Sequence, residues 1–252
     1  MYPRGKLTLV GAGPGDAELI TLKGLRVLSK ADVILYDALI NTELLDYAPQ
    51  AEKFFVGKRK GCSAYSQNQI HELIVALAKE GKHVVRLKGG DSFVFGRGSE
   101  ELEYASAYGL SIAVIPGISS SLAVPASYNI PVTQRGVAES FWVVTGTTKN
   151  HELSNDVRLA AQSSATVIIL MGMSKLPEIM NSFKSAGKSN TPVAVIQEGT
   201  TSKARVAYGN VHNIVSEVGL KGLSNPAIIV VGEVVNAGNY KAYLSQVLQY
   251  SN

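Results

Sequence analysis

The stretch Arg86–Glu101, RLKGGDSFVFGRGSEE, connects the end of a predicted buried strand, His83–Leu87, to the start of a predicted helix. Its Gly89-Gly90-Asp91 corner therefore lies at the carboxyl end of a strand, where ligands of open α/β sheets bind. Glycines, which have no Cβ atom, let the backbone take positive φ angles and approach a ligand closely. Arg97 and Glu100 follow within one helical turn of each other. They form either a surface ion pair or part of a site for a planar anion.

Strands and helices alternate on both sides of this stretch. Apolar runs predict further strands at Leu7–Val10, Asp32–Tyr36, Phe54–Val56, Ile112–Ile115, Phe141–Thr145, Thr166–Leu170, Val193–Gln197, Ala204–Tyr208 and Ala227–Val231. Helical spacing of apolar residues predicts helices at Glu18–Ala31, Gln67–Lys79, Glu100–Tyr108, Ser174–Ser185 and Val211–Val218. This alternation predicts an α/β fold with two α/β domains, 1–116 and 117–240, followed by a tail at 241–252. The closely spaced strands within Val193–Tyr208 indicate a mixed second sheet with an antiparallel hairpin.

The composition narrows the class of protein. The chain has 252 residues, of which 46% are hydrophobic and 17% charged, as is typical of a globular protein. Its formal charge of +4 permits an anionic partner but does not indicate a dedicated nucleic-acid binder. Cys62 is the only cysteine, so we expect no intrachain disulfide and a reducing, cytoplasmic location. Without a signal-peptide pattern, a run of about 18 apolar residues or metal-ligand spacing among the histidines, we expect neither a membrane partner nor a metal.

The first glycine cluster, Gly11–Asp16, directly follows a predicted strand and imitates a dinucleotide-binding fingerprint. That fingerprint requires a third glycine where this chain has Asp16, and Pro14 lacks one of the backbone donors that would hold a pyrophosphate. An acidic side chain would also repel phosphate. The cluster therefore predicts either a tight turn into a helix or contact with a ligand that is neutral or cationic, rather than NAD or FAD.

Polar side chains follow several other apolar runs. The serines of Pro116–Ser121 suit the start of a helix, where they either cap free amides or contact a ligand. The basic run Lys58–Lys60 is either solvated or directed at an acidic substrate. Asp37 follows the predicted strand Asp32–Tyr36, where it either caps a turn or enters a site. Arg135 supplies a further cation after an apolar stretch.

Taken in order along the chain, these segments resemble the tetrapyrrole methylases. The resemblance is carried by Gly11–Asp16, Glu18–Thr21, Tyr36-Asp37, Val56–Lys58, Leu87–Arg97, Pro116–Ser120, Met171-Gly172, Gln197–Thr200 and Asn225–Ala227. It runs from Lys6 to Val235, which is nearly the whole chain. It implies S-adenosylmethionine (SAM) as the methyl donor, bound in the cleft between the two α/β domains, a tetrapyrrole substrate and a homodimer.

The resemblance also implies roles for individual residues. It assigns SAM contacts to Pro14, Gly89, Gly90, Asp91, Val94, Ser119, Ser120, Met171, Gly199 and Ala227. Asp37 and Lys58 match positions of a proton acceptor and a proton donor. Arg97, Glu100 and Arg135 match positions that face the tetrapyrrole. The chain departs from the usual family pattern at Ser92, where the family has proline.

Within this family the chain is most similar to the enzymes that act on uroporphyrinogen III. That similarity implies two successive C-methylations giving precorrin-2, on the way to sirohaem, cobalamin or haem d1. A substrate with many carboxylates fits the cations Arg97, Arg135 and Lys58–Lys60, and the sulfonium of SAM needs no phosphate-binding loop. Three alternatives stay open: another precorrin methylase of the same fold, a ribosomal RNA methyltransferase with salt-dependent binding, and a sensor that binds without turnover.

Overall fold

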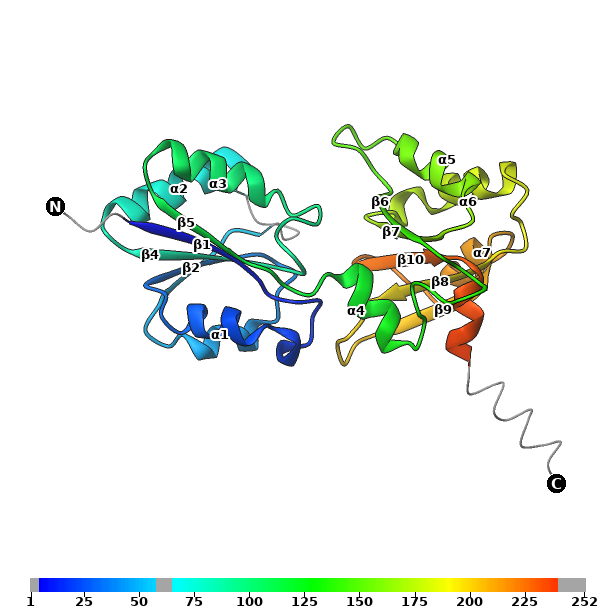
Figure 1. Ribbon diagram of the computed structural model, residues 1–252, viewed down its shortest axis with the longest axis horizontal. Helices are drawn as coiled ribbons and strands as arrows, with labels where there is room; N and C mark the ends of the chain where they lie inside the picture. The colour runs from blue at the N-terminus through cyan, green and yellow to red at the C-terminus, as the bar shows by residue number, and fades with distance from the viewer. Residues whose placement is uncertain (1–4, 58–64, 240–252) are drawn as a thin grey trace, which may run out of the picture. The chain divides into compact units, whose positions relative to one another are not determined.

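The computed structural model describes residues 5–57 and 65–239 and divides into two compact units, Met1–Ser119 and Ser120–Asn252. Each unit contains one five-stranded sheet with helices packed on it (Figure 1). The predicted α/β class is therefore confirmed. The domain boundaries predicted at residues 116 and 240 stay a prediction, and the tail at 241–252 lies outside the described residues. Within the described part of the chain, no helix has both the length and the apolar character needed to cross a membrane.

The sheet of the first unit is parallel throughout. Its strands are β1 (Lys6–Gly11), β2 (Val33–Tyr36), β3 (Glu52–Phe55), β4 (His83–Lys88) and β5 (Ser111–Ile115), in the order β3-β2-β4-β1-β5. Its helices are α1 (Leu22–Leu28), α2 (Gln67–Lys79) and α3 (Gly98–Ala107), with short 3-10 segments at Ala17–Leu19 and Thr42–Tyr47. In such a sheet, all loops that follow the strands lie at one edge.

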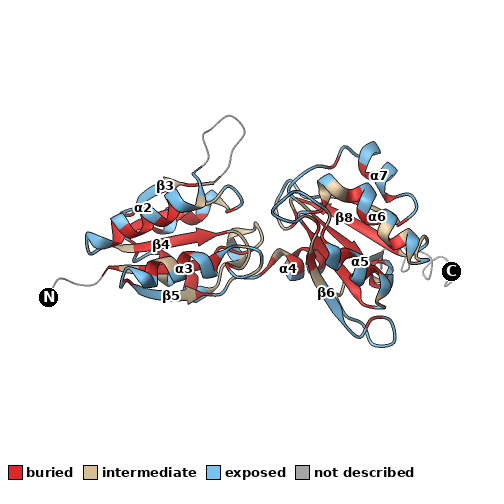
Figure 2. Cartoon of the chain, turned by 90° about the horizontal axis from the view of Figure 1, so that it is seen from above, coloured by how far each residue is buried: buried red, intermediate tan, exposed pale blue. Residues whose placement is uncertain are grey.

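Helices cover both faces of this sheet, so its strands are buried on both sides. The helices α2 and α3 pack on one face with Leu7, Leu9 and Val84, while α1 packs on the other. Figure 1 shows α2 and α3 on one side of the strands and α1 on the other, and Figure 2 shows the strands as buried and the outer surfaces of α2 and α3 as exposed. Because β4 lies in the centre of the sheet, alternate side chains enter different cores: Val85 and Leu87 face the core of α1.

The second unit has a mixed sheet. Its strands are β6 (Phe141–Thr145), β7 (Thr166–Leu170), β8 (Pro192–Gln197), β9 (Arg205–Asn210) and β10 (Ala227–Val231), in the order β6-β7-β10-β8-β9. The pair β6–β7 is parallel, and the three other pairs are antiparallel. The antiparallel hairpin of β8 and β9 confirms the prediction for Val193–Tyr208. The helices are α4 (Ser120–Ser127), α5 (Asn155–Gln162), α6 (Leu176–Ser185) and α7 (Ile214–Leu220), with 3-10 segments at Met173–Lys175 and Glu233–Asn239.

Local sequence signals explain which elements were predicted well. The bounds of α2 agree with the prediction from apolar spacing, and Ser66 and Gln69 form a capping box at its start. The predicted helix Glu18–Ala31 was too long: Thr21 accepts a hydrogen bond from the Gly24 amide at 3.0 Å and starts α1 only at Leu22. The helix α5, capped by Ser154, was not predicted.

The loops after β1, β4 and β5 touch one another through backbone atoms. A Cβ atom added to Gly117 would lie 2.3 Å from the Gly90 carbonyl oxygen and 2.6 Å from the Gly11 Cα atom. Such distances are far below van der Waals contact, and backbone atoms cannot rotate out of the way. Glycine is therefore required at this position by the packing of the three loops.

We expect Gly117→Ala to lower the free energy of unfolding by about 1–3 kcal/mol, because the added methyl group overpacks the three loops. Gly219→Ala is the matched control, since Gly219 lies inside α7 and a Cβ atom there would meet nothing within 4 Å. The control should raise stability by about 0.5–1 kcal/mol through the lower backbone entropy of alanine in the unfolded chain. Urea unfolding of both variants measures these changes. Wild-type stability of Gly117→Ala would contradict the packing argument.

Candidate active site

The carboxyl edge of the first sheet brings together the glycine segments that the sequence singled out. Gly13 and Gly90 exchange two backbone hydrogen bonds, of 3.2 and 2.6 Å, and both have positive φ angles. The loop after β1 is thereby joined to the corner after β4. Gly90 is partly exposed and has no side chain to cover its backbone, as expected for a site that admits a ligand close to the main chain.

The Asp91 carboxylate joins this pair to the loop after β5. Its Oδ2 atom accepts a hydrogen bond from the Gly117 amide at 3.0 Å, and its Oδ1 atom accepts one from the Phe93 amide at 2.8 Å. Hydrogen bonds from neutral amides to a carboxylate are among the stronger kind in proteins. The resemblance assigns Asp91 a contact with SAM, which stays a prediction, and the structure gives each of its oxygens a backbone partner. Asp91 therefore fixes the shape of the glycine loops.

The turn between Asp91 and α3 is strained. Phe95 and Arg97 have φ angles of 54° and 59°, in the left-handed region that disfavours residues with a Cβ atom. The rings of Phe93 and Phe95 are exposed. Strained residues of this kind collect at functional sites, where the surrounding structure holds them in place. The turn therefore places two aromatic rings and Arg97 at the same edge of the sheet as the glycine loops.

Arg97 and Glu100 form a bidentate ion pair at the start of α3. The distances are 2.9 Å from Nε to Oε1 and 2.5 Å from Nη2 to Oε2, and both side chains are about half exposed. The hydrogen bond from Arg97 lowers the pKa of Glu100, and the same bond raises the pKa of Arg97. This is the ion pair that the sequence offered as one of two possibilities. Its exposure leaves both groups accessible to a charged molecule.

Asp37 is held by a residue that sequence reasoning missed. Its Oδ1 atom accepts a hydrogen bond of 2.6 Å from Nη2 of Arg86, whose side chain is 3% exposed. The sequence placed Arg86 at the end of an apolar strand and assigned it no role. A signal was available, since Arg86 and Lys88 are two apart in a strand and so lie on the same face.

A buried network of charged groups continues from Arg86 to α3. Glu101 has a fully buried side chain, and its Oε1 atom lies 3.3 Å from Nε of Arg86 and 2.9 Å from Nζ of Lys88. Gln67 of α2 also donates to Oε1 at 3.1 Å. Burial, followed by the nearby charge of Arg86, lowers the pKa of Lys88. Buried charges are tolerated when they are paired and hydrogen-bonded in this way.

His71 lies at the edge of this network and is held neutral. Nε2 of Gln67 lies 3.0 Å from Nε2 of His71, and an amide nitrogen can only donate. The His71 nitrogen must therefore accept, which requires it to carry no proton. Burial lowers the pKa of His71, opposed by the charge of Glu101. The imidazole also stacks on the ring of Tyr104 at 4.8 Å.

The remaining predicted residues are dispersed over both units. Lys58 lies outside the described residues. In the second unit, Met171 directly follows β7 with a φ angle of 54°, and it is half exposed. Gly199 lies between two residues with positive φ angles, and a Cβ atom there would meet Val124 of α4 at 2.3 Å. Ala227 begins β10, and Arg135 is exposed in the turn between Gln134 and Ala138.

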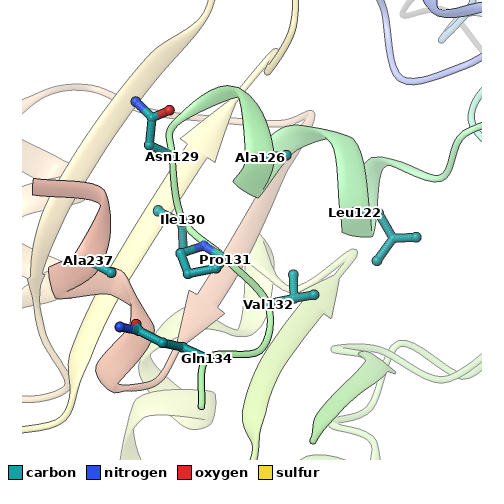
Figure 3. A pocket seen from close by; sticks show the side chains of 8 residues that line it. All are labelled: Leu122, Ala126, Asn129, Ile130, Pro131, Val132, Gln134 and Ala237. Atoms are coloured by element: carbon teal, nitrogen blue, oxygen red, sulfur yellow. The ribbon is translucent and has the colours of Figure 1, made fainter. Parts of the chain in front are cut away.

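A pocket of about 660 Å³ lies within the second unit (Figure 3). It is lined by Leu122, Ala126, Asn129, Ile130, Pro131, Val132, Gln134 and Ala237. No charged side chain is among these lining residues, and none of the predicted site residues lines it. By itself this pocket does not provide the cations that a polyanionic ligand requires.

We expect the stability of the protein to fall as the pH drops below about 6.5, the ordinary pKa of histidine. Burial lowers the pKa of His71 in the folded state, so the unfolded state binds more protons in this range. The stabilisation is therefore present above that pH and is lost as the pH falls through the lowered value. His71→Gln should lose less stability than the wild type between pH 7 and 5.5 in urea unfolding, although the partly buried His83 contributes in the same direction. An equally steep loss in the variant would contradict a neutral His71.

Comparisons with known proteins cover both units of the chain. The sequence profile of the tetrapyrrole (corrin/porphyrin) methylases matches residues 6–215. Uroporphyrinogen-III C-methyltransferase of Methanocaldococcus jannaschii is 49% identical over 235 residues, which are 92% of this chain and 97% of that protein. Siroheme synthase 1 of Cronobacter sakazakii is 44% identical over 92% of this chain, and the chain spans 50% of the length of that relative.

A solved structure supports the same relationship. Uroporphyrin-III C-methyl transferase from Thermus thermophilus, complexed with S-adenyl homocysteine, superposes with a TM-score of 0.80 at 36% identity. The alignment covers 92% of this chain and 99% of that one. Profile, sequence identity and fold therefore agree over most of the chain. The chain belongs to the tetrapyrrole (corrin/porphyrin) methylase family.

Proposed function

We propose that the chain is a SAM-dependent C-methyltransferase that converts uroporphyrinogen III to precorrin-2 by two successive methylations. The observation that carries this proposal is the similarity to the Methanocaldococcus jannaschii enzyme of that activity, which extends over nearly the full length of both chains. The co-substrate is SAM, and the product is S-adenosylhomocysteine, in keeping with the ligand in the Thermus thermophilus structure. A homodimer is part of the same proposal.

The glycine loops of the first unit suit SAM as a ligand. Gly90 is partly exposed and pairs with the buried Gly13, and a Cβ atom at Gly89 would already be 3.1 Å from Leu39. SAM brings a sulfonium cation and no phosphate, so the loop needs no set of phosphate-binding donors. SAM supplies an electrophilic methyl group. The proposed contacts are Pro14, Gly89, Gly90, Asp91, Val94, Ser119, Ser120, Met171, Gly199 and Ala227.

In this proposal Asp91 contacts SAM and also holds the loops on which SAM lies. Its two hydrogen bonds to the amides of Phe93 and Gly117 fix the corner on which the Gly89 and Gly90 main chain lies. The contribution of this corner is alignment, because a methyl transfer requires the donor and the acceptor carbon to lie in line at close distance.

The proposed tetrapyrrole side of the site consists of charged side chains. Arg97 and Arg135 are exposed cations that would pair with substrate carboxylates. Lys58 is proposed to lie on the same tetrapyrrole side of the site. Asp37 or Glu100 would take up the proton released when the methylated ring rearranges. Among the described residues, Oδ2 of Asp37 has no hydrogen-bond partner, so this oxygen can accept a proton while Oδ1 remains bound to Arg86.

This division of tasks is tested by two variants. Asp91→Ala removes both hydrogen bonds that fix the glycine loops, so SAM should bind at least about tenfold more weakly, equivalent to about 1.4 kcal/mol. Arg97→Ala should leave SAM binding within about twofold of the wild type and lower kcat/KM about 10- to 100-fold, because it removes a cation for the substrate carboxylates. Calorimetric titration with SAM and a methyl-transfer assay measure the two effects. Weakened SAM binding in Arg97→Ala and not in Asp91→Ala would contradict the assignment.

The reaction itself is tested by the product. Anaerobic incubation of the protein with SAM and uroporphyrinogen III should give a tetrapyrrole heavier by two methyl groups in mass spectrometry. Asp37→Asn should form this product at least about tenfold more slowly, because a proton acceptor is lost. No mass gain with uroporphyrinogen III would contradict the proposed substrate. Methylation of a later precorrin instead would indicate another methylase of the same fold.

A further inference from the structure

We propose that Arg86 is a positioning residue for the Asp37 carboxylate, and that Glu101 in turn holds Arg86 in place. The inference rests on the proposed function, because it assigns Arg86 and Glu101 to the same site through the proposed proton acceptor Asp37. Neither residue was singled out by the sequence or by the family resemblance. Both belong to the buried network between β2, β4 and α3.

The Arg86 guanidinium is fixed on three sides. Nη2 binds Oδ1 of Asp37 at 2.6 Å, and Nε lies 3.3 Å from Oε1 of Glu101. Nη1 donates to the carbonyl oxygens of Leu35 and Leu87, each at 3.3 Å. Because every nitrogen of this planar group has a partner, the group has one orientation, and Asp37 is bound to its fixed edge.

The sheet register explains why this arginine reaches Asp37. Arg86 of β4 lies beside Leu35 of β2, and Asp37 follows the last residue of β2. The long arginine side chain therefore runs along the buried face toward the carboxyl edge and meets Asp37 there. A shorter cation with one nitrogen could bind Asp37 or Glu101, but it could not hold both in a fixed geometry.

Glu101 closes the network on the helix side. Its buried carboxylate contacts Arg86, Lys88 and Gln67 through the single atom Oε1. The two carboxylates Asp37 and Glu101 are balanced by the two cations Arg86 and Lys88, so the buried group is neutral overall. Removing one charge would leave an uncompensated ion in the core, which is costly.

The network also connects Asp37 to the proposed substrate side of the site. Glu101 immediately follows Glu100, and its amide donates to the Arg97 carbonyl oxygen at 3.4 Å. The anchored carboxylate therefore holds the first turn of α3, which carries the exposed Arg97–Glu100 pair. The Arg86 guanidinium thus binds Asp37 on one side and Glu101 on the other, so it fixes Asp37 relative to the Arg97–Glu100 pair.

The decisive variant is Arg86→Lys, which keeps the charge and removes the fork. We expect kcat to fall at least about tenfold while SAM affinity stays within about twofold, because the glycine loops are untouched. In an Asp37→Asn background, Arg86→Lys should lower kcat by no more than about twofold further, because it acts through Asp37. If Arg86 only stabilised the fold, the loss of kcat in the double variant would be the product of the losses in the two single variants.

Lys82→Gln is the matched control. Lys82 precedes the same strand at its opposite end and pairs with Glu52 and Glu80, so Lys82→Gln breaks ion pairs beside this strand but away from the site. It should leave kcat and SAM affinity unchanged. A tenfold loss of kcat in Lys82→Gln would overturn the inference, because the loss in Arg86→Lys would then not be specific to the network.

Glu101→Asp provides a second test should Arg86→Lys fail to fold. It keeps the negative charge but shortens the side chain, which draws the carboxylate away from Arg86, and it should also lower kcat without adding to Asp37→Asn. A folded Arg86→Lys variant with the wild-type kcat would overturn the inference. So would a double variant with Asp37→Asn whose loss of kcat is the product of the two single losses. Either outcome would leave the proposed function standing. A wild-type protein that methylates no tetrapyrrole would overturn the proposed function and this inference together.

Discussion

The carbonyl oxygen of Gly90 occupies the space in which a Cβ atom of residue Gly117 would have to lie. This contact lets the loops after β1, β4 and β5 close on one another at the carboxyl edge of the first sheet. The Gly13–Gly90 pair and the two hydrogen bonds of Asp91 then fix the closed arrangement. The proposed SAM contacts of the first unit depend on this edge, because a displaced loop would misalign a donor that has to lie in line with its acceptor.

Beneath that edge, the first unit encloses a group of charges where a parallel sheet normally has apolar side chains. Arg86 and Lys88 extend from the central strand into the core beneath α2 and α3, where Glu101 receives both. Such a group contributes little to the stability of the fold, since well-packed apolar residues in place of a buried ion pair often give an equal or higher free energy of unfolding. Its value lies in geometry: it relates the Asp37 carboxylate at the end of β2 to the start of α3.

The two halves of the proposed site are therefore built differently. In the first unit, the proposed SAM contacts lie on loops held by glycine packing and by one carboxylate. The tetrapyrrole side consists of charged side chains, of which Arg97 and Glu100 are exposed and paired with each other. An exposed ion pair contributes little to stability, so it can exchange partners with a charged substrate at small cost. Strain at Phe95 and Arg97 marks the turn where the two halves meet.

Local sequence patterns were sufficient for the elements and the family. Apolar runs placed β6, β7 and β10 at their observed bounds, and the helical spacing of apolar residues placed α2. These features depend on neighbours within a few residues, which a sequence displays directly. The ordered motifs also identified the family. By contrast, α5 was missed and the helix predicted at Glu18–Ala31 was too long, because caps rather than apolar spacing set their bounds.

What the tertiary structure alone decided is which charged groups meet. Arg86 looked like part of an apolar strand, and only the pairing of β4 with β2 brings it to Asp37. Only the packing of α3 on the sheet buries Glu101 against Arg86 while the adjacent Glu100 stays exposed. The physical reason is that partners distant along the chain are selected by sheet register and helix packing, whereas the sequence displays each charge without its partner.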